Sequence, residues 1–224
     1  MRALIFAAGF GERMRPLTDT TPKPLLAVGG KPLIVWHLER LAAIGVREVV
    51  INTAWLARRF PEVLGDGAAV GVHIRYSVEG ETPLETGGGM LHALPLLGDA
   101  PFLAINGDIW STHPLATLPR EPQGLAHCVL VPLPAFRTPA AFEQTVTPLL
   151  AADAPAHTLA GIGVYRPELV RLHAPGRFSI TPLLTAAAGV GRVSVEPHQG
   201  EWEDVGTPER LADLDRRLLQ RDKT

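Results

Sequence analysis

The chain has 224 residues, 46% of them apolar, and a formal net charge of −2 at pH 7. This length and apolar content fit one α/β domain with a substantial core, and the lack of a basic block argues against nucleic acid or an anionic membrane as a partner. No apolar run approaches the roughly 20 residues of a membrane span, and the single cysteine, Cys128, excludes an internal disulfide. We therefore expect a cytoplasmic protein.

Apolar runs and helical patterns alternate along the first half of the chain. They predict strands at 2–8, 48–52, 72–78 and 102–105, and helices at 33–44, 55–64 and 89–94, the last ended or kinked by Pro95. This order of strands and helices predicts a doubly wound, mostly parallel sheet.

The second half continues with shorter elements. Strands are predicted at 125–131, 160–165 and 193–195, and a helix at 180–188. Thr207 and Pro208 form an N-cap and first-turn pair that predicts a last helix, and Leu211, Leu214 and Leu218 form its buried face.

The loop after the first strand contains Gly9 and Gly11, followed by Arg13 and, ten positions later, Lys23. Glycines let backbone N–H groups approach an anion closely, and the two cations can neutralise its charge, so the pattern favours a triphosphate site. A signal peptide is disfavoured because the apolar run is short and charged residues follow it. Met14 replaces the third glycine of a dinucleotide fingerprint, and the Gly-Lys-Ser/Thr ending of a P-loop is missing. The glycines alone also fit a generic loop with solvated arginines.

Two aspartates occur near predicted strands, Asp108 after the strand at 102–105 and Asp204 before the last helix. Mg²⁺ prefers carboxylate, phosphate and water oxygens, so two carboxylates beside a triphosphate would suit it. The alternatives are structural, since Asn106-Gly107 is also a hairpin signal and Asp204 lies in a charged segment. Glu203 should point away from Asp204 in extended backbone, and we expect it to be a bystander.

Three consecutive glycines, 87–89, lie at the start of a predicted helix. The first N–H groups of a helix have no partner within it and are accessible to a ligand where side chains are absent. The segment 84–89 is therefore a second candidate for contact with a nucleotide, and a flexible loop is the alternative.

Residues 5–18 and 22–25 resemble the signature of the sugar-nucleotidyltransferase (NDP-sugar pyrophosphorylase) family, which runs Leu-Ala-Ala-Gly-x-Gly-Thr/Glu-Arg-Met/Leu-x-Pro-Leu-Thr and then Pro-Lys-Pro-Leu. The resemblance implies a single Rossmann-like α/β domain over residues 1–224, here without the C-terminal β-helix of many members. It implies a nucleotide half at about 1–110 and a sugar-binding half at about 111–224. The stretches 12–15 and 84–89 look most like the N-acetylmuramate 1-phosphate uridylyltransferases of bacterial peptidoglycan recycling.

The resemblance also implies roles for individual residues in nucleotidyl transfer from UTP to a sugar 1-phosphate. Asp108 and Asp204 match the aspartates that hold the catalytic Mg²⁺, Arg13 matches the residue on the β- and γ-phosphates, and Lys23 lies near the α-phosphate. The residues expected to contact the nucleotide are Ala8, Gly9, Gly11, Glu12, Arg13, Lys23, Glu85 and Gly88. Thr158 and Gly161 stand where the family approaches the sugar.

The segment 132–156 departs from the family pattern, so the acceptor stays open. Ala141 stands where the uridylyltransferases carry an aspartate, and the Glu-Lys-Pro of many hexose enzymes is missing. Alternatives are mannose 1-phosphate with GTP, glucose 1-phosphate with UTP or dTTP, and phosphocholine with CTP. A regulatory binding protein without catalysis is a further alternative. Such a protein should have lost a metal-binding aspartate or the loop arginine, whereas Arg13, Lys23, Asp108 and Asp204 are all present. We expect a monomer, because no apolar interaction helix is obvious.

Overall fold

A computed structural model describes residues 1–134, 146, 149–150 and 155–221. The strands are β1 (Arg2–Phe6), β2 (Ala27–Val28), β3 (Lys31–Pro32), β4 (Glu48–Thr53), β5 (His73–Val78), β6 (Phe102–Asn106), β7 (Ile109–Ser111), β8 (Ala126–Pro132), β9 (His157–Tyr165), β10 (Val193–Pro197) and β11 (Trp202–Asp204). The helices are α1 (Leu33–Ala43), α2 (Arg59–Leu64), α3 (Glu85–Leu97), α5 (Glu168–Arg171), α6 (Thr181–Gly189) and α7 (Pro208–Arg221).

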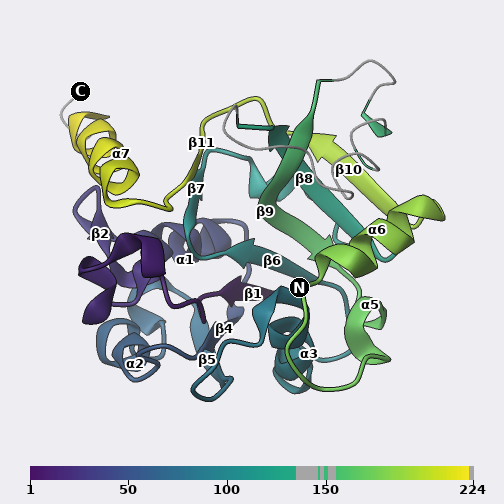
Figure 1. Ribbon diagram of the computed structural model, residues 1–224, viewed down its shortest axis with the longest axis horizontal. Coiled ribbons are helices and arrows are strands. Elements are labelled where there is room, and N and C mark those ends of the chain that lie inside the picture. The colour runs from purple at the N-terminus through teal and green to yellow at the C-terminus, as the bar shows by residue number, and fades with distance from the viewer. Residues whose placement is uncertain (135–145, 147–148, 151–154, 222–224) are drawn as a thin grey trace.

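A seven-stranded sheet forms the centre of the molecule, in the order β10-β8-β9-β6-β1-β4-β5 (Figure 1). Every neighbouring pair is parallel except those of β9, which runs antiparallel to both β6 and β8. The expected doubly wound, mostly parallel α/β fold is thus confirmed.

Helices cover both faces of this sheet because strand side chains alternate between the faces. Ile5 and Ile51 pack toward α1 and α2 in one apolar cluster. Leu4 and Val50, each one position earlier, pack toward α3, α5 and α6 in another. Strands that are apolar on both faces therefore form the middle layer of three, as parallel strands generally do.

Some helix boundaries predicted from the sequence differ from those in the structure. The helix expected at 89–94 is α3, which begins at Glu85, and Pro95 lies inside its final turn without ending it. The earlier start is stabilised from outside the helix, because the N–H groups of Gly87 and Gly88 both donate to the carbonyl of Phe178, at 3.0 Å each. The helix expected at 55–64 is shorter, and α2 begins at Arg59.

Asn106-Gly107 does not form a hairpin. β6 continues through a tight turn into β7, but β7 pairs with β11 in a separate two-stranded sheet. The N–H of Gly107 donates to the carbonyl of Phe6 at 2.8 Å, and a Cβ at Gly107 would lie 2.7 Å from that same oxygen. The glycine therefore lets the chain cross closely over the end of β1, and the turn carries Asp108.

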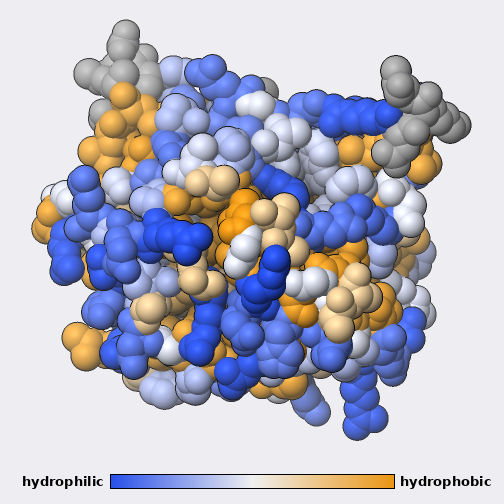
Figure 2. Space-filling model, turned by 180° about the vertical axis from the view of Figure 1, so that it is seen from behind, coloured by the Kyte–Doolittle hydropathy of each residue, from blue (hydrophilic) through white to orange (hydrophobic). Residues whose placement is uncertain are grey.

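One face of the molecule is mainly polar. Figure 2 shows one face of the molecule, where hydrophilic residues are spread throughout and hydrophobic residues lie in separate patches. In the part of the chain that the structure describes, no helix combines the length and the apolar character needed to cross a membrane.

Candidate active site

The loop after β1 is fixed in a conformation that requires glycine at position 11. Gly11 has φ +66°, and a Cβ there would lie 2.8 Å from Cγ2 of Thr18. The hydroxyl of Thr18 donates to the Gly11 carbonyl at 2.8 Å. Gly11 is thus required both by its backbone angle and by close packing, and it precedes the short 3₁₀ turn Glu12–Met14.

A cavity of about 290 Å³ opens where three neighbouring parallel strands end. Phe6 of β1 is in register with Asn52 of β4 and with Asn106 of β6, and all three residues line the cavity. Ligands of open α/β sheets bind at such carboxyl ends of strands. The other lining residues are Ala7, Ala8, Gly9, Gly11, Lys23, Pro24, Pro83, Glu85, Thr86 and Asp108.

Lys23 and Asp108 form an ion pair on the wall of this cavity. The Lys23 Nζ lies 2.6 Å from Oδ2 of Asp108, and the side chains are 13% and 34% exposed. Residues 85 positions apart in the sequence are thereby brought together. The lysine is mostly withdrawn from water, so its charge would act strongly on an anion that entered the cavity.

A second depression, of about 580 Å³, adjoins the first and shares Gly11 and Lys23 with it. Its other lining residues are Phe10, Glu12, Arg13, Met14, Arg177 and Gly206. Three cations, Arg13, Lys23 and Arg177, therefore line one continuous hollow. Sequence reasoning missed Arg177, because nothing in its local pattern signals that the segment between α5 and α6 approaches the N-terminal loop. Its Nε donates to Oε1 of Glu85 at 3.0 Å.

Asp204 lies on β11, next to the strand that follows Asp108. Asp204 is the register partner of Ile109, and the N–H of Val205 donates to the carbonyl of Asp108 at 3.0 Å. Among the described residues, no three His, Cys, Asp or Glu side chains form a cluster that could hold a metal. The two partly exposed aspartates could therefore hold a metal only together with oxygens from substrate or water, as Mg²⁺ sites commonly do.

The glycines at the start of α3 serve packing. The Gly88 N–H, expected to be free, donates to Phe178, and a Cβ at Gly88 would lie 2.2 Å from the carbonyl oxygen of Gly176. The expectation of free N–H groups at this helix start is wrong, because the segment between α5 and α6 covers it. Glu85, in contrast, lines the first cavity, with φ +64°.

A third, mostly apolar cavity of about 160 Å³ adjoins the first and shares Phe6, Thr86 and Asn106 with it. Gly161 lines it with φ +76°, and a Cβ at this position would meet the Asn106 side chain at 2.7 Å. Thr158 is 1% exposed, pairs with Val131 of β8 and is not among the lining residues. Ala141 and most of the segment that departs from the family pattern lie outside the described residues.

Residues 2–132 match the family model described as nucleotidyl transferase. The chain belongs to this family. The nucleotidyltransferase is 47% identical over 221 residues to the N-acetylmuramate alpha-1-phosphate uridylyltransferase of Neisseria meningitidis, with 94% of this chain and 95% of the relative covered. It is 34% identical to the protein of the same name from Caulobacter vibrioides, with 97% of each chain covered.

Two further similarities are more limited. A mannose-1-phosphate guanylyltransferase of Mycobacterium tuberculosis is 39% identical over 116 residues, which cover 52% of the nucleotidyltransferase and 32% of the relative. A solved structure titled as a putative glucose-1-phosphate thymidylyltransferase from Bacillus anthracis in complex with a sucrose superposes with a TM-score of 0.81. It covers 98% of this chain and 95% of its own at 20% identity, which shows the shared fold.

A buried and a partly buried side chain of α1 hold β7 of the nucleotidyltransferase, and with it the turn that carries Asp108. The His37 Nε2 lies 2.9 Å from the carbonyl oxygen of Ile109, which fits an Nε2–H donor. Arg40 donates to the carbonyl of Ser111 at 2.7 Å. Burial, reinforced by the nearby Arg40 charge, lowers the pKa of His37 to about 4, so this histidine is neutral at physiological pH.

A polar network that sequence reasoning missed supports the other side of the cavity. The N–H of Ala7 donates to Oδ1 of Asn52 at 2.7 Å, and the N–H of Leu84 donates to Oε2 of Glu79, also at 2.7 Å. Burial raises the pKa of Glu79. The feature of the sequence that could have indicated this network is Asn52, a polar residue at the end of an otherwise apolar strand.

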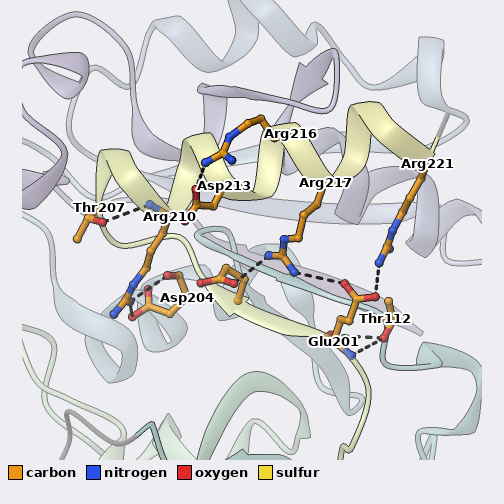
Figure 3. Close-up of polar contacts among 10 residues, drawn as sticks. Thr112, Glu201, Asp204, Thr207, Arg210, Asp213, Arg216, Arg217 and Arg221 are labelled. Atoms are coloured by element: carbon orange, nitrogen blue, oxygen red, sulfur yellow. Dashed lines mark hydrogen bonds and ion pairs between the residues drawn. The ribbon is translucent and has the colours of Figure 1, made fainter. Parts of the chain in front are cut away.

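A row of ion pairs attaches α7 to β11 (Figure 3). Glu203, expected to be a bystander, pairs with Arg217 at 3.0 Å. Thr207 accepts a hydrogen bond from the N–H of Arg210 at 3.4 Å, which fits the predicted N-cap. Leu214 and Leu218 are buried and Leu211 packs against their cluster, so the predicted apolar face of this helix is confirmed.

Proposed function

We propose that this nucleotidyltransferase transfers a uridylyl group from UTP to N-acetylmuramate α-1-phosphate, giving UDP-N-acetylmuramate and pyrophosphate in peptidoglycan recycling. The observation that carries the proposal is the 47% identity to the Neisseria uridylyltransferase over nearly the whole of both chains. The joined cavities lined by Lys23 and Asp108 supply a site with the chemistry that such a reaction needs.

In the proposed reaction an anionic oxygen of the sugar 1-phosphate attacks the α-phosphorus of UTP, and the bond to the β-phosphate oxygen breaks. The nucleophile is already an anion, so no general base is required and catalysis rests on positioning and charge neutralisation. Lys23 would neutralise the α-phosphate. Arg13, in the adjoining depression, would bind the β- and γ-phosphates through its planar fork and hold the departing pyrophosphate.

Asp108 and Asp204 would together hold Mg²⁺. Their oxygens are the ligand type that Mg²⁺ prefers, both side chains are about one-third exposed, and the residue after Asp204 donates a backbone hydrogen bond to Asp108. When bound, the ion would neutralise charge shared by the two anionic substrates. Asp108 would then exchange its ion pair with Lys23 for the metal, which would release the lysine toward phosphate.

The base and ribose would occupy the cavity beside Ala8, Gly9 and Glu85, and the sugar would lie toward the third cavity beside Gly161. A mostly apolar chamber next to polar groups suits a sugar that carries acyl and ether substituents. The proposal includes a nucleotide half at about 1–110, a sugar-binding half at about 111–224, a cytoplasmic location and a monomeric state.

A mannose-1-phosphate guanylyltransferase activity is the second candidate. It is favoured by the 39% identity to the Mycobacterium enzyme, which covers 52% of this chain. That match spans only about half of the chain, so it bears less on the acceptor than the full-length match does.

The test is pyrophosphate release with Mg²⁺ across UTP, GTP, CTP and dTTP, each combined with N-acetylmuramate, mannose and glucose 1-phosphates and with phosphocholine. We expect the UTP and N-acetylmuramate α-1-phosphate pair to give the highest kcat/KM. An Asp108→Asn variant serves as the inactive control. Release with GTP and mannose 1-phosphate alone would overturn the proposed acceptor and donor, and release with no pair would overturn the enzymatic function.

A further inference from the structure

Arg210, in the first turn of α7, contacts Asp204 at two points (Figure 3). Its NH1 donates to the backbone carbonyl of Asp204 at 3.2 Å and lies 3.5 Å from the carboxylate Oδ2. The arginine side chain is 27% exposed and that of the aspartate 32%. One guanidinium thus ties both the main chain and one carboxylate oxygen of the same residue to the helix.

The other carboxylate oxygen of Asp204 lies near Gly206, which also neighbours Arg13. A Cβ placed on Gly206 would lie 3.2 Å from Oδ1 of Asp204 and 2.9 Å from NH2 of Arg13. Gly206 also lines the depression that holds Arg13 and Lys23. The two oxygens of Asp204 therefore have different surroundings, with Oδ2 next to Arg210 of α7 and Oδ1 next to Gly206.

We infer that Arg210 is a positioning residue that orients Asp204 so that Oδ1 is presented to the catalytic metal ion. The inference rests on the proposed function, since it assigns Asp204 to the metal. Partners in the second coordination shell fix the orientation of a carboxylate ligand, and their loss commonly weakens metal affinity by about 10- to 100-fold.

Arg210 can affect metal binding in two ways, through its positive charge and through the orientation that it gives Asp204. A cation beside a carboxylate opposes the binding of a second cation, so removal of the Arg210 charge alone would strengthen metal binding. Loss of the orientation of Asp204 would weaken metal binding. The sign of the change in metal affinity therefore distinguishes the two effects.

Arg217 provides a matched control on the same helix. It pairs with Glu201 at 3.4 Å and Glu203 at 3.0 Å, on and beside the strand that carries Asp204. Both arginines are partly exposed and form ion pairs of the kind that contribute little to stability, so Arg210→Met and Arg217→Met are both expected to fold. Methionine keeps much of the apolar stem of arginine and removes the charge and the donors.

The experiment measures Mn²⁺ binding by electron paramagnetic resonance of the free ion, for the whole protein alone and with a non-hydrolysable UTP analogue. We expect Arg210→Met to raise the Mn²⁺ Kd by about 10-fold or more and Arg217→Met to leave it unchanged. In the pyrophosphate assay, Arg210→Met should require more Mg²⁺ for half-maximal activity, with kcat recovering at saturating Mg²⁺. Arg210→Lys, which keeps the charge on a side chain with a shorter reach, should recover the affinity only in part.

An unchanged or lower Mn²⁺ Kd in Arg210→Met overturns the inference, as does an equal rise in Arg217→Met or full recovery with lysine. If the wild-type protein releases pyrophosphate and binds Mn²⁺ while Arg210→Met matches it, only the positioning role fails. If the wild-type protein does neither, the proposed function fails as well.

Discussion

His37 is expected to make this protein sensitive to mild acid. The ring is 1% exposed, it supports β7 through Ile109, and burial lowers its pKa from 6.5 to about 4. Its Nδ1 has no hydrogen-bond partner among the residues that the structure describes. Protonation would therefore place an unpaired charge in the core beside Arg40.

Proton linkage gives the sign and the size of the change in folding stability with pH. Between pH 6.5 and about 4 the unfolded chain binds a proton at this site and the folded chain does not, so stability falls as the pH falls through this window. The full pKa difference corresponds to about 3 kcal/mol, of which about 2 kcal/mol should be lost between pH 7 and pH 5.

The assay is urea unfolding followed by circular dichroism at pH 7 and pH 5, for the wild type and for His37→Gln. Glutamine can still donate a hydrogen bond toward the Ile109 carbonyl but does not titrate. We expect the wild type to lose about 2 kcal/mol more than His37→Gln between the two pH values. His73→Gln, at an exposed site, serves as the control and should behave as the wild type does. The reasoning is refuted if His37→Gln and the wild type lose the same free energy, since the buried histidine would then not contribute to the acid sensitivity.

Three further predictions concern the site. Gly88→Ala should lower the midpoint of urea unfolding, because its Cβ would lie 2.2 Å from the Gly176 carbonyl oxygen, and an unchanged midpoint would contradict this packing role. Gly11→Ala should cost about 1–2 kcal/mol of stability, through its left-handed backbone and its contact with Thr18, and a midpoint equal to that of the wild type would count against it. Arg13→Ala should fold normally and lose about 3 kcal/mol of transition-state stabilisation, or about 100-fold in kcat, and normal turnover at saturating substrates would remove its assigned role.

Most of the fold could be predicted from local pattern. Strands such as β1 and β4 are apolar on both faces, and such runs predict a buried parallel sheet whatever the rest of the chain does. The start of α3 could not be predicted, because it depends on the Phe178 carbonyl, which approaches from about 90 positions away. The pairing of β7 with β11 escaped prediction for the same reason, since a three-residue strand gives almost no local signal.

The sequence by itself determined the residue types of the candidate site, and the spacing of Gly9, Gly11, Arg13 and Lys23 after a predicted strand predicts a triphosphate site. Only the tertiary structure decided which groups are still available in that site. It pairs Lys23 with Asp108, uses the N–H groups of the glycine run for packing, and ties Asp204 to α7. The physical reason is that residue type and spacing determine which interactions a segment can make, whereas segments distant in the sequence determine which of them are already satisfied when the chain has folded.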